Sequence, residues 1–265
     1  MPHSSPAFVK DFRFLILVIG NSRSHFGYFA GQKLVKTWDT EHISQPVTAI
    51  PRELLPLGIP PQLSHSLPLY LASVVPEQTQ LWRSYTCGKE ITLAHLPLEG
   101  IYPTMGIDRA LAAYGAVKSW DSPALVIDGG TALTLTGIQE NYKLIGGAIL
   151  PGLRSQFLSL SQTTAALPDL VLPSQLPARW SLNTEEAIAS GILYTILPGI
   201  REFIIDWWED FPEGRVIFTG GDGAWLVETL SVLYSEFAGK IELDLDLIFK
   251  GIWEVVNSQT HPIRC

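Results

Sequence analysis

Residues 14–19 read FLILVI and lead directly into Gly20-Asn21-Ser22. An apolar run of this length that ends in small polar residues is typical of a buried strand followed by a tight turn. The pattern returns at 124–127, which read ALVI and lead into Asp128-Gly129-Gly130-Thr131. Aligning Gly20 with Gly130 superposes the two stretches, so the sequence indicates two similar halves, although unrelated strand-turn units would look alike.

The rest of the chain alternates between the strand and helix patterns, which predicts a mixed α/β fold. We expect further strands at 25–29, 33–38, 69–75, 80–83, 90–94, 133–137, 148–150 and 215–218. We expect helices at 108–120, 153–162, 184–208 and 224–236, with Pro198 kinking or splitting the third.

Composition limits the partners that this chain can have. Of its 265 residues, 46% are hydrophobic, which is enough for two medium domains with their own cores. The formal net charge is -8, so we expect no nucleic acid partner. The run 14–19 is too short for a signal peptide or a membrane span, and Cys87 and Cys265 are expected to be free thiols. We therefore expect a soluble, cytoplasmic protein with no membrane partner.

Glycine-rich turns follow three of the expected strands. The third turn, Thr219-Gly220-Gly221-Asp222-Gly223, comes directly after the strand at 215–218. Glycine lets backbone N–H groups approach an anion closely, and a neighbouring hydroxyl or amide adds a directed hydrogen bond. Each turn alone reads as an ordinary hairpin turn, but three at strand ends indicate a nucleotide-binding cleft.

Two carboxylates, Asp128 and Asp108, are candidates for binding a cation and for accepting a proton. Asp128 ends an apolar strand, where it could hold a cation or could only form an Asx-turn with Gly130. Asp108 and Arg109 stand at the mouth of a predicted helix. Asp108 could accept the proton of a substrate hydroxyl and Arg109 could bind a carboxylate or phosphoryl oxygen, or the pair could be a helix-dipole aspartate and a solvated arginine.

Two more segments each allow a functional and an ordinary interpretation. Gly146-Gly147 and Pro151-Gly152 bracket a short strand just before a helix, which suits a phosphate-facing helix start and equally a plain β-to-α connection. Asn183-Thr184 reads as a helix N-cap, although the threonine hydroxyl could also face a substrate.

Taken together and in order, these motifs resemble those of the type III pantothenate kinases, a family of the acetate and sugar kinase, heat-shock ATPase and actin superfamily. The resemblance covers most of the chain. Its motifs here are Gly20-Asn21-Ser22, Gly106-Ile107-Asp108-Arg109, Asp128-Gly129-Gly130-Thr131-Ala132, Gly146 to Gly152, Asn183-Thr184, Gly191 and Thr219-Gly220-Gly221-Asp222.

The resemblance implies an enzyme that phosphorylates pantothenate with ATP to give 4'-phosphopantothenate, the first step of coenzyme A biosynthesis. Asp108 would be the catalytic base. The residues implied to contact pantothenate are Tyr102, Gly106, Ile107, Asp108, Arg109 and Thr184. The residues implied to contact ATP are Val18, Ile19, Gly20, Asn21, Ser22, Arg23, Ser24, His25 and Thr131.

The resemblance also implies a fold, cofactors and an assembly. The fold would be two ribonuclease H-like domains, residues 1–120 and 121–265, that share an interdomain cleft, with the last helix able to pack on the first domain. Magnesium would accompany ATP, and Asp128 would lie at a monovalent cation site for potassium or ammonium. The family is homodimeric, with substrate pockets near the dimer interface.

One position departs from the family pattern. The first loop of the family reads Asp-x-Gly-Asn-Thr, and here Val18 stands at the aspartate position and Ser22 at the threonine position. Serine keeps the hydroxyl, but valine cannot replace a carboxylate. The segment before Gly106 is also shorter than in relatives, which affects the contact expected of Tyr102. A non-catalytic regulator that binds nucleotide or pantothenate, or a sugar kinase of the same superfamily, are the alternative hypotheses.

Overall fold

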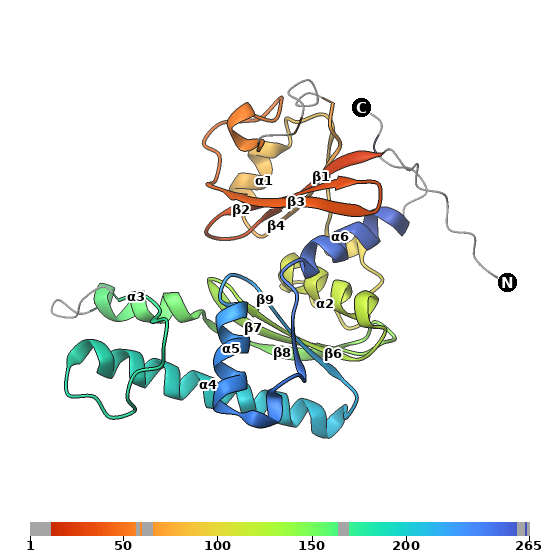
Figure 1. Cartoon of the computed structure of the whole chain (residues 1–265). Coiled ribbons are helices and arrows are strands. Elements are labelled where there is room, and N and C mark those ends of the chain that lie inside the picture. Colours follow the sequence, from red (N-terminus) through yellow and green to blue (C-terminus); the bar gives the residue numbers. More distant parts are fainter. Residues whose placement is uncertain (1–11, 57–58, 60–65, 164–169, 259–262, 264–265) are drawn as a thin grey trace. The chain divides into compact units, whose positions relative to one another are not determined.

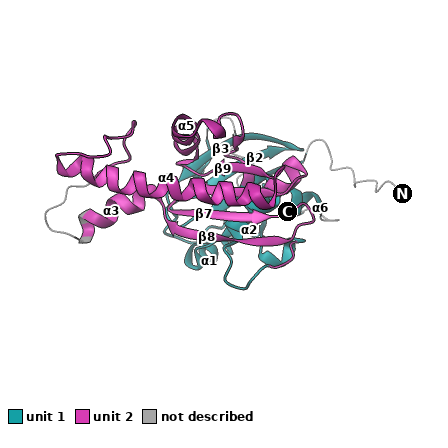
Figure 2. Cartoon of the chain, turned by 90° about the horizontal axis from the view of Figure 1, so that it is seen from below, with its two compact units in different colours: residues 1–97, 101–115, 248–265 teal, residues 98–100, 116–247 magenta. Residues whose placement is uncertain are grey.

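The structure, a computed structural model, describes residues 12–56, 59, 66–163, 170–258 and 263. The chain divides into two compact units, coloured separately in Figure 2. Unit 1 comprises residues 1–97, 101–115 and 248–265, and unit 2 comprises residues 98–100 and 116–247. The last helix of the chain thus belongs to unit 1, and the boundary expected between residues 120 and 121 stays a prediction.

Unit 1 contains a mixed five-stranded sheet (Figure 1). Its strands are β1 (Arg13–Ile19), β2 (Ser24–Ala30), β3 (Lys33–Thr40), β4 (Leu69–Ser73) and β5 (Gly88–Glu90). The strand order is β3-β2-β1-β4-β5, with β1, β2 and β3 antiparallel and with β4 parallel to both β1 and β5. The β1–β2 hairpin turns at Gly20-Asn21-Ser22, as the sequence pattern predicts.

Unit 2 repeats this arrangement. Its strands are β6 (Ala124–Gly129), β7 (Ala132–Ile138), β8 (Leu144–Pro151), β9 (Arg215–Thr219) and β10 (Ile241–Leu243). The order is β10-β9-β6-β7-β8, again three antiparallel strands extended by two parallel ones. Each sheet therefore has the ribonuclease H-like order that we expected, and the recurrence of the strand-turn motif reflects two halves of similar topology.

Helices follow the strands in both units. The helices are α1 (Pro76–Trp82), α2 (Ile107–Trp120), α3 (Leu153–Thr163), α4 (Thr184–Asp210), α5 (Gly223–Leu233) and α6 (Leu247–Ser258), with short 3-10 turns at Arg52–Leu54, Leu93–His95 and Ser235–Phe237. In each half, one helix follows the fourth strand and another follows the fifth. Helices α3 and α4 form an additional pair between β8 and β9.

The two faces of the unit 1 sheet are both covered. Alternate residues of β1, such as Leu15 and Leu17, are buried in an apolar cluster that includes Trp82 of α1. On β2, a β-carbon at Gly27 would meet the ring of Phe249, so α6 packs closely against this strand. Because β1 is buried on both faces, it reads as a continuous apolar run rather than an alternating one.

The core of unit 2 is built around α4. Its buried side chains, among them Leu193, Leu197 and Ile204, belong to the same cluster as Ile127 of β6 and Phe218 of β9. By length and composition α4 is also the one helix in the described part of the chain that could cross a membrane, but a core helix passes the same test. One side of α4 packs into the core of unit 2 through these buried side chains.

Some expectations about secondary structure were wrong. Residues 80–83 are not a strand, because Pro76 begins a helix that runs to Trp82. The strand expected at 90–94 ends at Glu90. Pro198 does not split α4, which continues to Asp210.

The expectation of free thiols was also wrong for Cys87. That residue is buried and disulfide-bonded in the structure, and the other cysteine of the chain, Cys265, lies outside the described residues. The expectation rested on the small number of cysteines, which does not determine whether a given cysteine is paired.

Candidate active site

The turn after β1 is closed by a backbone hydrogen bond, and the strand residue that leads into it, Val18, is apolar. The N–H of Gly20 donates to the carbonyl of Arg23 at 3.1 Å, which closes the turn. Asn21 and Ser22 are exposed at its tip, and Val18 is buried below it with 4% of its surface accessible. The turn can therefore offer amide, hydroxyl and backbone groups to a phosphate, but residue 18 gives it no carboxylate.

Asp108 stands in the first turn of α2, and its carboxylate lies close to Gly106. A β-carbon at residue 106 would collide with this carboxylate, so a larger residue there would displace the Asp108 side chain. The backbone N–H of Arg109 donates to Asp108 Oδ1 at 2.8 Å. Burial raises the pKa of the Asp108 carboxyl above its usual range, and this bond and the Arg109 charge oppose the rise.

Arg109 is buried, with 8% of its surface accessible. Its Nη1 donates to the hydroxyl of Tyr102 at 2.9 Å, and Tyr102 itself is partly exposed. The N–H of Met105 donates to the carbonyl of Tyr102 at 2.9 Å, which folds the loop that carries the tyrosine back toward the helix. A buried guanidinium that is held by a neighbouring phenol is preorganised to bind a carboxylate or phosphate.

Val74, just after β4, connects these two features of unit 1. Its N–H donates to the carbonyl of Ile19 at 3.0 Å, directly before the Gly20 turn. A β-carbon at Gly106 would lie 3.9 Å from Val74 Cγ1. The predicted phosphate turn and the predicted base thus lie at one end of the sheet, at the carboxyl ends of the parallel strands β1 and β4. Ligands commonly bind at that end of a sheet.

In unit 2, Asp128 is the second-to-last residue of β6 and lies beside the turn after β9. Gly220 has φ +80, and a β-carbon there would collide with Asp128 Oδ1. The N–H of Asp222 donates to the carbonyl of Gly129 at 2.8 Å and ties the two turns together. Asp128 is partly accessible and flanked across the sheet by Thr134 and Thr219. This polar setting differs from the apolar setting of Val18.

Asp222 and Arg154 form an ion pair beside these turns. Arg154 Nε donates to Asp222 Oδ1 at 3.0 Å, and the Asp222 side chain is only 4% exposed. Burial raises the pKa of the Asp222 carboxyl, and the Arg154 charge and hydrogen bond oppose this rise. The pair connects the start of α3 to the start of α5.

Thr131 lies at the tip of the turn after β6. Its carbonyl accepts hydrogen bonds from the N–H of Gly152 at 2.9 Å and from Ser155 Oγ at 2.7 Å. Since Gly152 directly precedes α3, the Gly146–Gly152 segment does lead into a helix beside this turn. The exposed threonine could contact a phosphate, as the sequence predicts.

Thr184 is the first residue of α4 and is exposed. Asn183 caps the helix, because its Oδ1 accepts a hydrogen bond from the N–H of Glu186 at 2.9 Å. The N-cap interpretation of Asn183 is therefore confirmed, and a contact between Thr184 and a substrate stays a prediction.

The side chains of the described residues bear on how a metal ion could be bound. Among the described residues, no group of three or more His, Cys, Asp or Glu side chains could hold a metal ion by itself. Magnesium is usually held by one or two carboxylates together with substrate phosphates rather than by a closed protein cage, so a magnesium ion that enters with ATP needs no such group.

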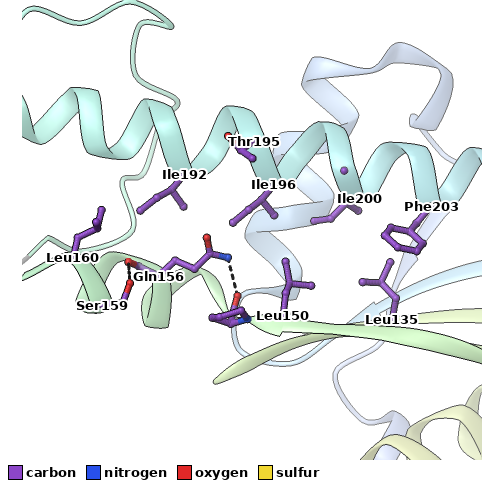
Figure 3. A pocket seen from close by; sticks show the side chains of 12 residues that line it. Leu135, Leu150, Gln156, Ser159, Leu160, Ile192, Thr195, Ile196, Ile200 and Phe203 are labelled. Atoms are coloured by element: carbon purple, nitrogen blue, oxygen red, sulfur yellow. Dashed lines mark hydrogen bonds between the residues drawn. The ribbon is translucent and has the colours of Figure 1, made fainter. Parts of the chain in front are cut away.

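Unit 2 also contains an apolar groove of about 540 Å³ (Figure 3). Side chains of α4, such as Ile192, Ile196 and Phe203, face Leu135 and Leu150 of the sheet across it. Its polar contacts are local: Gln156 Nε2 donates to the carbonyl of Pro151, and Ser159 Oγ donates to the carbonyl of Gln156, each at 2.8 Å. The groove includes none of the predicted site residues, and its lining does not suit phosphates.

Comparison with known proteins agrees with the motifs. Residues 14–206 match the family model for type III pantothenate kinase. The chain belongs to the type III pantothenate kinase family. A type III pantothenate kinase from a Nostoc species is 44% identical over 260 residues, covering 92% of this chain and 94% of the relative. One from a Synechocystis species is 46% identical over 258 residues, covering 96% and 94%.

Solved structures show the same fold at much lower identity. A protein from Campylobacter jejuni described as a Baf family transcriptional activator aligns with a TM-score of 0.60 at 20% identity, covering 92% of this chain and 97% of that chain. A protein from Sinorhizobium meliloti described as a 2-dehydro-3-deoxygalactonokinase aligns with a TM-score of 0.52 at 12% identity, covering 93% and 97%. Both likenesses concern the fold of this type III pantothenate kinase family member, not its chemistry.

Two charged residues near the predicted site were missed as site residues. Asp222 was part of a quoted turn motif but received no role, and Arg154 was not singled out. The sequence signal that could have found Asp222 is its position after Gly220-Gly221 at the end of a strand. Arg154 has no comparable signal, because its partner stands 68 residues later in the chain.

Proposed function

We propose that this chain phosphorylates pantothenate with ATP to give 4'-phosphopantothenate. Membership of the type III pantothenate kinase family supports this function. The structural observation that carries it is the position of Asp108, a partly buried carboxylate beside the phosphate turn after β1. A base at this position could serve a hydroxyl that attacks a phosphoryl group.

The reaction transfers one phosphoryl group. The oxygen of the substrate hydroxyl forms a bond to the γ-phosphorus, the bond from that phosphorus to the β,γ-bridging oxygen breaks, and ADP leaves. Asp108 accepts the proton of the hydroxyl. Because burial raises the pKa of this carboxyl, it binds that proton more tightly than an ordinary aspartate would.

Arg109 and Tyr102 would hold the other end of the substrate. Pantothenate carries a carboxylate, and the buried guanidinium of Arg109 provides a charge-assisted hydrogen bond of the kind that such a group needs. The bond from Arg109 to the Tyr102 hydroxyl fixes the guanidinium before substrate arrives. The backbone at Gly106 and Ile107 and the hydroxyl of Thr184 complete the proposed pantothenate contacts.

Both glycine turns would serve ATP. We assign phosphate contacts to residues 18–25 after β1 and to Thr131 after β6. Magnesium bound to ATP would neutralise charge on the phosphates, and Asp128 would hold a monovalent cation, potassium or ammonium.

We further propose a cytoplasmic homodimer. Large apolar side chains of unit 2 are exposed, among them Phe203, which lines the groove, at 47% and Leu158 of α3 at 44%, and exposed apolar surface of this kind commonly marks an interface. Phe203→Asp is expected to shift the protein from dimer to monomer in light scattering. Val232→Asp, a substitution of an exposed residue on α5, is the control that should stay dimeric. A wild type that is monomeric would refute the homodimer.

The first experiment measures ADP release by purified protein with ATP, magnesium and pantothenate, with and without potassium. We expect turnover that potassium stimulates and that Asp108→Asn lowers by about 10²- to 10⁴-fold. Turnover that requires a sugar, with no competition by pantothenate, would instead identify a sugar kinase.

A second candidate function, a regulator that binds ligands without turnover, is favoured by one observation. Val18 is buried where the family pattern has an aspartate, so the first phosphate loop lacks a carboxylate. The regulator hypothesis predicts pantothenate binding by calorimetry and no ADP release by well-folded wild-type protein.

A further inference from the structure

The end of β3 contacts the phosphate turn of unit 1 at several points. Asp39 Oδ1 accepts a hydrogen bond from His25 Nδ1 at 2.7 Å, and Asp39 Oδ2 pairs with Arg23 Nη1 at 3.3 Å. His42, just beyond the strand, places its Nε2 2.9 Å from the carbonyl oxygen of Gly20. Asp39 and His42, which have no motif in the sequence, thus contact the turn that is predicted to bind ATP.

The position of Asp39 follows from the register of the sheet. Val18 of β1 pairs with His25 of β2, and His25 pairs with Asp39 of β3. The three residues form one row across three strands, next to the Gly20 turn. The carboxylate of this row is that of Asp39 on β3, which contacts Arg23 and His25, whereas β1 contributes Val18.

The ion pairs of Asp39 contribute little to folding stability. The side chains of Arg23, His25 and Asp39 are 55%, 39% and 49% exposed. Ion pairs with this exposure are screened by water and salt, and ordering a long arginine side chain costs entropy. Their main effect is to restrict where Arg23 and His25 point.

The contact of His42 acts on the backbone. A carbonyl oxygen only accepts hydrogen bonds, so His42 donates from a protonated Nε2. The peptide between Gly20 and Asn21 is planar, and its C=O and N–H point in opposite directions. Fixing the Gly20 carbonyl therefore also fixes the direction of the Asn21 N–H, a donor in the predicted phosphate turn.

Phosphate recognition needs both effects. A guanidinium has five N–H donors in a planar fork that matches phosphate oxygens, and the bond to Asp39 uses Nη1 of Arg23. Backbone N–H groups in a glycine turn bind an anion well only when they are already directed at it. A turn without a carboxylate at Val18 depends on such donors to hold the phosphates.

We propose that Asp39 and His42 are positioning residues for the phosphates of ATP. Asp39 orients Arg23 and His25, and His42 orients the peptide between Gly20 and Asn21. This inference rests on the proposed kinase function, because it assumes that ATP binds at this turn.

The test compares Asp39→Ala and His42→Ala with wild type. Each variant is expected to raise the KM for ATP about tenfold, with a smaller change in kcat, the same KM for pantothenate and an unchanged Tm. The dissociation constant of a non-hydrolysable ATP analogue, measured by calorimetry, should rise by the same factor. The conservative variants Asp39→Glu and His42→Gln should recover most of the loss.

The matched control is Glu90→Ala. Glu90 also belongs to an exposed ion pair of unit 1, with Arg83 at 3.4 Å, but it lies on β5. An unchanged KM for ATP in both alanine variants, or an equal rise in Glu90→Ala, would overturn the inference while leaving the kinase intact. Wild-type protein that neither binds nor turns over ATP would overturn both the inference and the proposed function.

Discussion

The two halves of the chain end their first strands in different chemistry. Val18 and Asp128 occupy equivalent positions, each two residues before the aligned glycine of its turn. Asp128 is flanked by the hydroxyls of Thr134 and Thr219, whereas Val18 is flanked by His25 and Ala72. The same topology therefore supports a carboxylate turn in unit 2 and a turn with basic side chains in unit 1.

Under the proposed function, the two units would have different roles. Unit 1 would supply the base and the basic side chains, and unit 2 would supply a carboxylate suited to a cation. A duplicated fold needs only one cation-binding carboxylate per ATP if the other turn binds phosphate through N–H and guanidinium groups. The following predictions test these roles, from the largest expected effect to the smallest.

Asp108→Asn should have the largest effect. Loss of the base is expected to lower kcat by about 10²- to 10⁴-fold. In the wild type, kcat/KM should rise with pH through the Asp108 pKa, because only the deprotonated carboxyl accepts a proton and burial raises that pKa above 3.8. A pH–rate profile that keeps this rise in the variant would contradict the assignment.

The same substitution should stabilise the folded protein at neutral pH. A carboxyl whose folded pKa is raised favours folding below its unfolded pKa, and that contribution is lost as pH rises through the folded pKa. Asparagine has no charged form to desolvate. We expect Asp108→Asn to have the higher Tm at pH 7 and no advantage at low pH.

Asp128→Val makes the turn of unit 2 resemble that of unit 1. We expect activity to fall at least about tenfold and stimulation by potassium to disappear, since a cation ligand is lost. Glu140→Ala removes an exposed carboxylate of the same unit and should change neither property. Full potassium stimulation in Asp128→Val would break the proposed difference between the halves.

Val18→Asp makes the reverse change. Residue 18 is 4% exposed and packed between strands, so an aspartate there should destabilise the fold by about 3 kcal/mol, the scale of an uncompensated buried charge. Urea unfolding measures this loss. A fully stable variant with higher activity at limiting magnesium would show that the two turns are interchangeable.

Arg154→Ala should have the smallest effect. It leaves the buried Asp222 carboxylate without its partner, but Arg154 is 67% exposed, so we expect a loss of only about 1 kcal/mol. The loss should shrink as pH falls, because protonation of Asp222, whose pKa is raised by burial, removes the unpaired charge. Adding Asp222→Asn should restore much of the stability; a double variant less stable than Arg154→Ala would argue against this pairing.

Most residues of the candidate site stand out in the sequence because they lie in short motifs. The turn after β1, the Gly106–Arg109 segment and Asp128 each combine glycine with a polar group at the end of an apolar run. Asp39, His42 and Arg154 have no such local signal. Their roles arise from partners on other elements, 14 or more residues away along the chain.

The sequence by itself determined the α/β class, the repeated strand-turn unit and the family. Those properties follow from hydrophobic periodicity and from turn residues, which act over a few positions of the chain. Only the tertiary structure decided that residues 80–82 are helical and that Asp39 faces His25 and Arg23. These features depend on strand register and on packing between distant segments, which no local pattern specifies.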